Sequence, residues 1–446
     1  MLLERIESAG LAQYSYIVGD GPTAIVIDPR RDCDIYLELA HSAGMRITTI
    51  LETHRHEDFA VGSVELATRT GAEIWHADAQ LPYHYGKAVT EGQTWQAGSL
   101  KLEALLTPGH TEGSMSYLLR DAGGAPWIIF TGDALFAGEV GRVDFLGMDR
   151  APELAGQLYD AIFGKLLPLG DGVLIGPGHG AGSPCGSAIA DRAWTSLGLE
   201  RTLNPRLQNT EREAFIADVV RQLPKPPYFT VIERLNLEGA PILGGIPLPP
   251  LLSVADFAAQ MSTALVVDVR SEFAFSTAHI PGAQFLDANR LAVFGGWFLP
   301  TDRPLLLVAD GNSPHEIMRA LIRLGYDNVC GMLAGGMTSW NVWARPVETL
   351  PMVTAQALRQ RLAEGEPAWL LDIRSAEELA SGRIEGAHLL PIRQLQGRED
   401  EVPRDVPVYV FCGSGTRATI AASWLQRQGW QNLHVVLGGF WAWDEG

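Results

Sequence analysis

The chain has 446 residues, of which 46% are hydrophobic and 19% are charged, and its formal net charge is −18. This length predicts two to four domains at ~100–200 residues each, and the hydrophobic content is sufficient for packed cores. The negative charge and the absence of any apolar run of ~18 residues exclude nucleic acid and a membrane from the expected partners.

The N-terminal segment "MLLERIESAG" contains no basic stretch followed by an apolar core, so no secretory signal peptide is predicted. The cysteines are too few and too scattered for a disulfide framework, which indicates a reducing compartment. We therefore expect a cytoplasmic protein, and we expect it to form a homo-oligomer. The four cysteines are Cys33, Cys185, Cys330 and Cys412.

The first predicted domain, residues 1–245, alternates strand-like and helix-like segments. It opens with "YSYIVGDGPTAIVIDP", two alternating apolar runs around a turn, which predicts a β-hairpin. Further on, "PELAGQLYDAIFGKLLPLG" predicts an amphipathic helix that Pro and Gly end. The segment "PILGGIPLPP" (residues 241–250) predicts a linker into the next domain.

Four apolar runs in this domain are each followed directly by residue types that bind metals. If the runs are strands, these side chains lie at strand ends, where sheet edges can converge on one pocket. A single histidine at a strand end is more often structural, but this many His and Asp residues at four strand ends favour a metal site. The motifs are "ITTILETHRHED" with His54, His56 and Asp58, "LKLEALLTPGH" with His110, "PWIIFTGD" with Asp133, and "GVLIGPGH" with His179.

The pieces "THRHEDF", "TPGHTEGS", "TGD" and "PGH" occur in the order found in the metallo-β-lactamase superfamily, which this part of the chain resembles. The resemblance implies an αββα sandwich with the metal at one edge. Hydrolases of that superfamily typically hold two zinc ions, and the second ion needs a histidine where this chain has Phe59. A phenyl ring cannot bind a metal, so a tight dinuclear site is disfavoured.

The motifs that remain resemble the persulfide dioxygenase branch of the superfamily. This resemblance implies that His54, His110 and Asp133 bind one Fe(II) per chain, because two histidines and one carboxylate are typical of non-haem Fe(II) oxygenases. Three further residues would then orient the ligands or transfer protons, or would be remnants of a dinuclear ancestor kept for packing. These residues are His56, Asp58 and His179.

Two residues near the expected metal site have alternative interpretations. Arg142, in "GRVDF", either anchors the substrate or forms an ordinary ion pair with Asp144. Cys185, in "GHGAGSPCG", is either a buried small hydrophobe or a candidate sulfur relay. This second segment lacks the tyrosine of the glutathione-persulfide members of the branch, so the thiol carrier is left open.

Two segments of the C-terminal half align without a gap. They are "VVDVRSEFAFSTAHIPGA" (residues 266–283) and "LLDIRSAEELASGRIEGA" (residues 370–387). A repeat period of this size indicates two copies of a whole domain, which we assign to residues 246–348 and 349–446. Each copy alternates strands and helices, which predicts a small α/β domain with a parallel sheet.

The second copy contains "VYVFCGSGTRATIAASWLQRQG", a predicted strand, loop and helix. The loop's glycines allow several backbone N–H groups to point at one centre before the helix N-terminus, which favours a Cys412 thiolate. Arg417 would add a forked cation for a bound oxyanion. An inert, buried Cys412 is the alternative. The remaining predicted anion-binding residues of the loop are Gly413, Ser414, Gly415 and Thr416.

The loop from Cys412 to Arg417 has six residues, and this length resembles the loop of the rhodanese family, whose cysteine carries a persulfide. Tyrosine phosphatases need a loop with one more residue to enclose phosphate. Within this family resemblance, Asp372 and Arg374 would stabilise the turn after the first strand. The first copy reads "LLLVADGNSPHEIMRALIRLG", which places Asp310 at the cysteine position before a loop about two residues shorter. We therefore predict that it is inactive and has a scaffold role, with Cys330 in its core.

The whole chain resembles bacterial persulfide dioxygenase–rhodanese fusions. The resemblance implies a low-molecular-weight thiol persulfide and O₂ as substrates of the iron site, with sulfite as product. The rhodanese domain would then transfer a sulfane sulfur to sulfite and form thiosulfate. A zinc thiolester hydrolase of the glyoxalase II type and a non-catalytic sulfur carrier or sensor are the alternatives.

Overall fold

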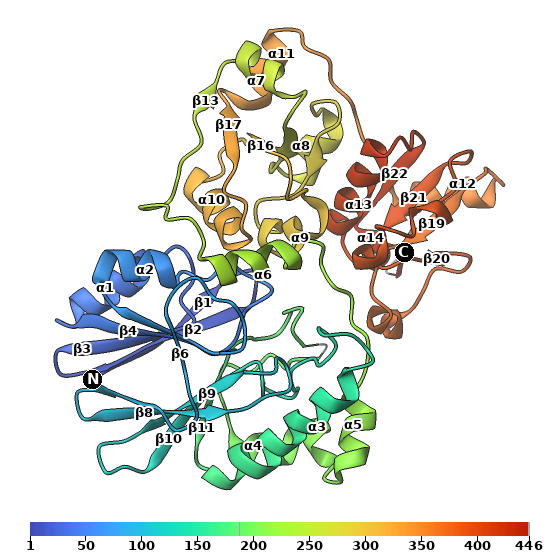
Figure 1. Cartoon of the computed structure of the whole chain (residues 1–446). Coiled ribbons are helices and arrows are strands. Elements are labelled where there is room, and N and C mark those ends of the chain that lie inside the picture. Colours follow the sequence, from blue (N-terminus) through green and yellow to red (C-terminus); the bar gives the residue numbers. More distant parts are fainter. Residues whose placement is uncertain (187, 445–446) are drawn as a thin grey trace. The chain divides into compact units, whose positions relative to one another are not determined.

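Two six-stranded sheets form the centre of residues 1–246 in the computed structural model, which describes residues 1–186 and 188–444 (Figure 1). The first sheet has the order β1-β2-β3-β4-β5-β6, and the second has the order β12-β11-β10-β9-β8-β7. The strands of the first sheet are Leu2–Ser8, Gln13–Asp20, Thr23–Ile27, Arg46–Glu52, Glu73–His76 and Lys87–Ala88. From β7 to β12, the strands of the second are Thr94–Ala97, Leu100–Leu106, Met115–Arg120, Pro126–Gly132, Leu174–Pro177 and Thr195–Ser196.

Helices cover the outer face of each sheet (Figure 1). Helices α1 (Asp34–Ser42) and α2 (Ser63–Thr70) lie against the first sheet, and α3 (Ala151–Ala161) and α5 (Arg212–Val219) lie against the second. The segment after α3 continues as a π-helix (Ile162–Leu166) and a 3₁₀ turn (Leu167–Leu169), so the predicted helix ends at the expected Pro and Gly. The other helices of this part are α4 (Leu197–Leu203), a 3₁₀ turn (Pro205–Gln208) and α6 (Phe229–Glu238).

Three apolar clusters separate these four layers. On β2, Ile17 packs toward the helices, whereas its neighbour Val18 packs between the sheets, because successive strand residues face opposite sides. On β9, Leu118 packs toward α3, and Leu119 faces the first sheet. Since both faces of each sheet are covered, a central strand such as β3 is an almost continuous apolar run, whereas edge strand β1 alternates with exposed charged residues. The predicted αββα sandwich and the predicted β2–β3 hairpin are confirmed.

Residues 247–321 and 326–446 form the second unit of the chain, and residues 322–325 group with the first. The second unit contains two five-stranded sheets with identical topology, β13-β17-β16-β14-β15 and β18-β22-β21-β19-β20, and all strand pairs are parallel. This identity confirms the two copies of a small α/β domain with a parallel sheet that the internal repeat predicts.

The strands of the first copy, β13 to β17, are Leu251–Leu252, Leu265–Asp268, Gln284–Phe285, Leu305–Val308 and Val329–Leu333. Its helices, α7 to α11, are Val254–Gln260, Glu272–Thr277, Leu291–Phe298, Pro314–Arg323 and Gly336–Val342. The strands of the second copy, β18 to β22, are Met352–Thr354, Trp369–Asp372, His388–Leu389, Val408–Phe411 and Leu433–Leu437. Its helices are α12 (Ala355–Ala363), α13 (Thr416–Arg427) and α14 (Gly439–Asp444), with 3₁₀ turns at Glu377–Ser381, Ile392–Gln394 and Glu399–Glu401. Among the described residues, no helix combines the length and apolar character needed to cross a membrane.

Strand register corrects the predicted alignment of the two copies at the cysteine position. Asp268 pairs with Val308 in the first copy, and Asp372 pairs with Phe411 in the second. The residue that follows each strand is therefore Ala309 in the first copy and Cys412 in the second, so Asp310 does not occupy the cysteine position. The loop before the helix is also not shorter: residues 309–313 connect β16 to α10, and residues 412–415 connect β21 to α13.

Candidate metal and sulfur-transfer sites

Four strand ends bring the predicted metal-binding residues together in the first unit. His54 follows β4, His110 follows β8, Asp133 follows β10 and His179 follows β11. All four residues are almost completely buried. The first belongs to one sheet and the other three to the second, so the cluster lies where the edges of the two sheets meet.

His54, His110 and Asp133 form a compact cluster of donor atoms that lie within 4.8 Å of one another. Asp133 Oδ2 lies 3.8 Å from His54 Nε2 and 3.5 Å from His110 Nε2. Within the described residues, none of these three atoms has a hydrogen-bond partner, although all are buried. Buried polar atoms are rarely left unpaired, because this costs about 1–3 kcal/mol per group. The set therefore fits a metal ion, which would satisfy all three atoms.

The other ring nitrogen of each histidine is held by a hydrogen bond that determines its tautomer. Thr53 donates its hydroxyl to Asp28 Oδ2 (2.8 Å), so Thr53 Oγ1 accepts from His54 Nδ1 (2.9 Å). The carbonyl oxygen of Arg142 accepts from His110 Nδ1 (2.9 Å). A neutral imidazole that donates through Nδ1 keeps its lone pair on Nε2. Both Nε2 lone pairs therefore face Asp133, as metal ligation requires.

Asp133 is oriented by His179. His179 Nδ1 donates to Asp133 Oδ1 (2.8 Å), and His179 Nε2 donates to Asp58 Oδ2 (2.8 Å). Burial opposes protonation of His179, but the two carboxylates outweigh it and raise the pKa well above its ordinary value. In turn, His179 holds the pKa of Asp133 far below its usual range despite burial. Asp133 is therefore a carboxylate with only Oδ2 available to a cation.

The two candidate histidine ligands differ in electrostatic environment. Burial lowers the pKa of His54 well below the ordinary value, which keeps its ring neutral. Burial also disfavours the charged form of His110, but Glu57 and Asp133 outweigh it and raise the pKa. A metal ion at this place would replace the proton that these carboxylates attract.

Sequence reasoning missed Glu57 as part of this cluster. Glu57 is fully buried, and its Oε2 lies 3.6 Å from His110 Nε2 without a hydrogen-bond partner among the described residues. Its Oε1 accepts from Arg55 Nη2 (3.1 Å). The signal was present, since Glu57 lies within "THRHED" between residues of ligand type. The direction of its side chain could not be inferred from the motif alone.

The neighbouring residues of the motif turn away from the cluster. His56 Nε2 forms an ion pair with Asp28 Oδ1 (2.9 Å). Burial disfavours its protonation, but Asp28 raises the pKa of His56 to about 9. Phe59 is fully buried and packs on the His56 ring at 4.6 Å between centroids. Asp58 reaches the cluster through the hydrogen bond that its Oδ2 accepts from His179 Nε2. The predicted supporting roles of His56, Asp58 and His179 therefore remain predictions with suitable geometry.

Arg142 is engaged by the chain itself, which favours the ion-pair interpretation over a substrate anchor. Asp144 accepts from its Nε (2.7 Å) and Nη2 (2.8 Å), and Leu223 O also accepts from Nη2 (2.9 Å). Its Nη1 donates to Pro184 O and Pro224 O, both at 3.2 Å. These bonds account for all five guanidinium N–H donors. The residue instead positions His110 through its carbonyl oxygen.

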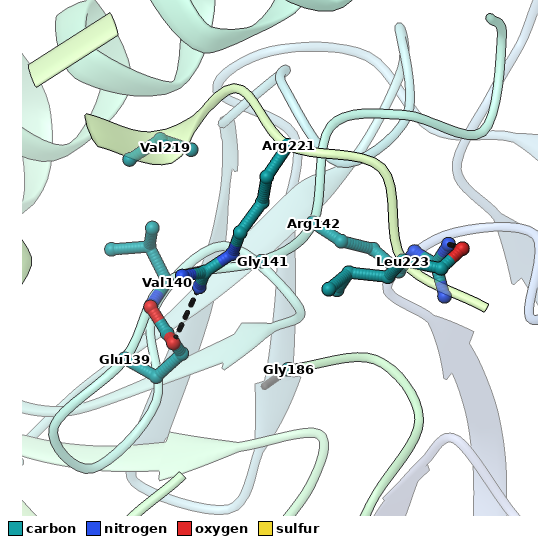
Figure 2. Close-up of a pocket in the computed structure, with 8 residues that line it drawn as sticks. All are labelled: Glu139, Val140, Gly141, Arg142, Gly186, Val219, Arg221 and Leu223. Atoms are coloured by element: carbon teal, nitrogen blue, oxygen red, sulfur yellow. Dashed lines mark hydrogen bonds and ion pairs between the residues drawn. The ribbon is translucent and has the colours of Figure 1, made fainter. Parts of the chain in front are cut away.

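A narrow cavity adjoins the segment Glu139–Arg142, whose last carbonyl oxygen accepts the hydrogen bond from His110 (Figure 2). Figure 2 shows Arg221 extending to Glu139, where its Nη2 donates to Oε2 (2.8 Å), while Arg142 lies beside Leu223. Gly141 in this segment has no room for a side chain, because a Cβ atom would lie 1.9 Å from Asp133 O. The segment is therefore packed tightly against the candidate metal ligands.

Cys185 lies near Asp58 and His179, and their donor atoms lie within 4.8 Å of one another. The side chain is fully buried. Burial, together with Asp58 and Asp133, raises the pKa of the Cys185 thiol well above its ordinary value. A protonated thiol is a poor sulfur nucleophile, so the chemistry favours a packing role over the predicted relay.

The loop that contains Cys412 curls around its sulfur atom. Cys412 is fully buried, and Gly415 N donates to its Sγ (3.1 Å). Gly415 has φ 125°, a conformation that side chains disfavour, and α13 begins at the next residue. Arg417 donates from Nη1 and Nη2 to the two carboxylate oxygens of Glu378 (2.7 and 2.6 Å). This forked pair sets the plane of the guanidinium beside the loop.

The remaining predicted loop residues have different environments. Ser414 is exposed and Gly413 is buried. The Trp441 ring, 63% exposed, lies beside Gly413, whose oxygen accepts from Trp441 N (3.1 Å). Thr416 donates its hydroxyl to Glu272 of the first copy (3.1 Å). An exposed serine and tryptophan leave one side of the loop accessible.

The turn after β19 is stabilised as the rhodanese resemblance implies. Asp372 Oδ1 and Oδ2 accept from Arg374 Nε and Nη2 (3.0 and 2.7 Å), and Gly382 O accepts from Nη2 (2.9 Å). The equivalent residues of the first copy, Asp268 and Arg270, make the same forked pair. Both copies therefore retain the turn, and they differ at the nucleophile.

Family models match both parts of the chain. The metallo-beta-lactamase superfamily model matches residues 9–179, and the rhodanese-like domain model matches residues 253–342 and 354–445. The mitochondrial persulfide dioxygenase of Bos taurus is 30% identical over 56% of this chain and 91% of its own. A hydroxyacylglutathione hydrolase of Rhodospirillum rubrum is 30% identical over 48% of this chain and 75% of its own.

A solved structure covers more of the chain. The metallo-beta-lactamase from Staphylococcus aureus subsp. aureus COL aligns over 74% of this chain and 98% of its own, with 30% identity and a TM-score of 0.68. Together with the family models, these relatives span the sandwich and both repeat copies. The chain belongs to the metallo-beta-lactamase superfamily, as a fusion of one metallo-beta-lactamase domain with two rhodanese-like domains.

Proposed function

We propose that the chain is an Fe(II)-dependent persulfide dioxygenase coupled to a sulfurtransferase. Its first site would oxidise the sulfane sulfur of a low-molecular-weight thiol persulfide to sulfite. Its Cys412 site would transfer a second sulfane sulfur to sulfite and form thiosulfate. The similarity to a persulfide dioxygenase over 91% of that protein supports the first activity.

The set of three unpartnered donor atoms carries this proposal. His54, His110 and Asp133 would hold one metal ion, and their tautomers and charge already suit it. Fe(II), when bound, would supply the oxygen and redox chemistry. Buried Phe59 supplies no ligand for a second ion, and Phe145 packs edge-on against His110 at 5.1 Å, which limits water beside that ligand.

In the second reaction, Cys412 would act as nucleophile and carrier. Its thiolate attacks the outer sulfur of R–S–S⁻, the S–S bond breaks, and R–S⁻ leaves. Sulfite then attacks the outer sulfur of Cys412–S–S⁻, which yields thiosulfate and regenerates the thiolate. Gly415 N–H stabilises the sulfur anion, and Arg417, held by Glu378, lies beside the loop as a cation for the oxyanion.

A zinc-dependent thiolester hydrolase is the second candidate. The hydroxyacylglutathione hydrolase relative favours it, because its identity to this chain is also 30%. Phe59 weighs against it, since hydrolases of this superfamily typically use a second ion at that place. The alternative of a non-catalytic sulfur carrier would require only the Cys412 loop.

Anaerobic purification, metal analysis and oxygen-electrode assays test these candidates together. We expect about one iron per chain and oxygen uptake with glutathione persulfide, coenzyme A persulfide or another low-molecular-weight persulfide. His110→Ala and Asp133→Ala should abolish both, whereas His41→Ala, on the exterior of α1, should abolish neither. Two tightly bound zinc ions with hydrolysis of S-lactoylglutathione would instead establish the hydrolase.

A further inference from the structure

The two copies of the second unit are joined through the helix that starts at the Cys412 loop. Ser423, in the middle of α13, accepts hydrogen bonds from Gln284 Nε2 (2.8 Å) and Phe285 N (3.1 Å) of the first copy. Gln284 Oε1 also accepts from Arg427 Nη1 (2.9 Å). Gln284 and Ser423 are fully buried. Edge strand β15 of the first copy therefore fixes α13 of the second.

A further contact reaches the first residue of the same helix. The hydroxyl of Thr416 donates to Glu272 Oε1, at the start of α8 (3.1 Å). Thr416 lies between Gly415, whose N–H contacts Cys412 Sγ, and Arg417. The first copy therefore holds Thr416, which lies directly between Gly415 and Arg417, the two residues positioned around the sulfur atom.

The repeat alignment shows that this contact is not a remnant of a second active site. Glu378, the partner of Arg417, aligns with Ala274 in the first copy, and Cys412 corresponds to Ala309. Glu272 aligns with Ala376, which has no carboxylate. The first copy has therefore lost the acid that would serve its own loop, and it has a different acid directed at the loop of its neighbour.

We propose that Glu272 is a positioning residue for the Cys412 loop, supplied by the copy that lacks a nucleophile. By accepting the Thr416 hydroxyl proton, it anchors the first turn of α13. This keeps Gly415 N–H and Arg417 directed at Cys412 while the sulfur atom gains and loses its persulfide. The proposal rests on the sulfur transfer proposed above and assigns part of that site to residues outside the catalytic copy.

The test uses the full chain with thiosulfate as sulfur donor and cyanide as acceptor. Cys412–S⁻ attacks thiosulfate and releases sulfite, and cyanide then takes the outer sulfur of Cys412–S–S⁻ as thiocyanate. Glu272→Ala should lower kcat on the order of ten-fold, the effect of one hydrogen bond to a charged group. The KM for thiosulfate should not rise, because the substitution removes a carboxylate near an anion site.

Rescue and coupling distinguish positioning from general structural damage. Glu272→Gln and Thr416→Ser keep an acceptor and a donor, so each should retain most of the wild-type kcat. Thr416→Val should resemble Glu272→Ala, and the double variant should lose no more than either single variant. Glu316→Ala is the matched control, because Glu316 lies on α10 of the same copy and forms an ion pair with Arg319 of its own helix, so the substitution should not change kcat.

A second readout separates failure of this proposal from failure of the proposed function. Iodoacetamide alkylation of Cys412, followed by peptide mass spectrometry, reports loop geometry without any sulfur transfer. Glu272→Ala should slow it several-fold, and Glu272→Gln should restore it. If the wild type forms no thiocyanate but alkylation responds in this way, sulfur transfer is wrong and the positioning role stands. Unchanged kcat and unchanged alkylation in Glu272→Ala, or losses that multiply in the double variant, would refute the positioning role.

Discussion

At the scale of single residues, the candidate metal site is defined by buried atoms that have no hydrogen-bond partner among the described residues. Leaving a buried donor or acceptor unpaired destabilises a fold, yet His54, His110 and Asp133 each present one such atom to a common point. The bonds behind them, from Thr53, Arg142 and His179, hold these atoms in place before any ion arrives. The ligands are therefore preorganised, and binding of an ion should stabilise the domain.

Glu57 adds a negative charge beside this point. Glu57→Gln should weaken metal binding about ten-fold or more, because it removes the charge that faces His110 while keeping the size of the side chain. A chelator competition under anaerobic conditions measures the effect. Glu233→Gln is the control, since Glu233 shares Arg55 with Glu57. Equal metal affinity in Glu57→Gln and wild type would remove Glu57 from the site.

The sequence was informative about ligand types and less so about side-chain direction. His54, His110 and Asp133 could be predicted because each polar residue follows an apolar strand, and strand ends converge. Glu57 could not, because its Oε2 lies beside His110, which belongs to a different sheet and is distant in the sequence. The environment of Arg142 depends on backbone carbonyls of Pro184, Leu223 and Pro224, which no local motif encodes.

At the scale of elements, the Glu139–Arg142 segment connects the second sheet to the metal site. It passes so close to the turn after β10 that a Cβ at Gly141 would meet Asp133 O at 1.9 Å and His110 Cβ at 3.2 Å. The backbone at Asp133 cannot move away from Gly141 without displacing the Asp133 carboxylate. A side chain at residue 141 is therefore difficult to accommodate.

Gly141→Ala should therefore lower both metal content and stability. Overpacking of this kind costs about 1–3 kcal/mol of unfolding free energy. Thermal unfolding and iron content per chain measure the two effects. Gly164→Ala is the matched control, because a Cβ there meets nothing within 4 Å, and it should be neutral or slightly stabilising. A Gly141→Ala protein with normal iron content would show that the segment can relax.

The alignment of the two copies at the nucleophile position could also not be predicted from the sequence. The sequence alone predicts Asp310 at the nucleophile position, with a shorter loop before the helix. The β14–β16 pairing places Ala309 there, because the loop of the first copy is one residue longer than that of the second. A single-residue difference in loop length cannot be located when the loop sequences themselves do not match. The parallel sheet of each copy, in contrast, could be predicted from the alternation of strands and helices, although the strand order could not.

At the scale of the whole molecule, the two proposed reactions belong to different units of the chain. Cys412→Ser should therefore leave persulfide-dependent oxygen uptake largely unchanged and remove thiosulfate formation. The product should shift toward sulfite, which ion chromatography measures. A collapse of oxygen uptake in a folded, iron-loaded Cys412→Ser protein would contradict the separation of roles.

The first repeat copy should stay inactive even when its nucleophile is restored. In a Cys412→Ser background, Ala309→Cys supplies a thiol at the strand end, but the following residues, "DGNSPH", contain no arginine. Ala274 likewise supplies no carboxylate to orient one. We expect no thiocyanate from thiosulfate and cyanide above the Cys412→Ser level. Activity in the double variant would mean that this copy lost only its cysteine and is not otherwise degenerate.

The contacts with helix α13 should make some positions of the first copy less tolerant of substitution than others. Because the first copy is not expected to be catalytic, its loop after β16, residues 309–313, should tolerate substitution. The positions that contact the second copy should not. Saturation mutagenesis scored by sulfur transfer should thus give an uneven tolerance map of the first copy. The permissive region would be this loop, and the intolerant positions would be Glu272 and Gln284, which contact α13.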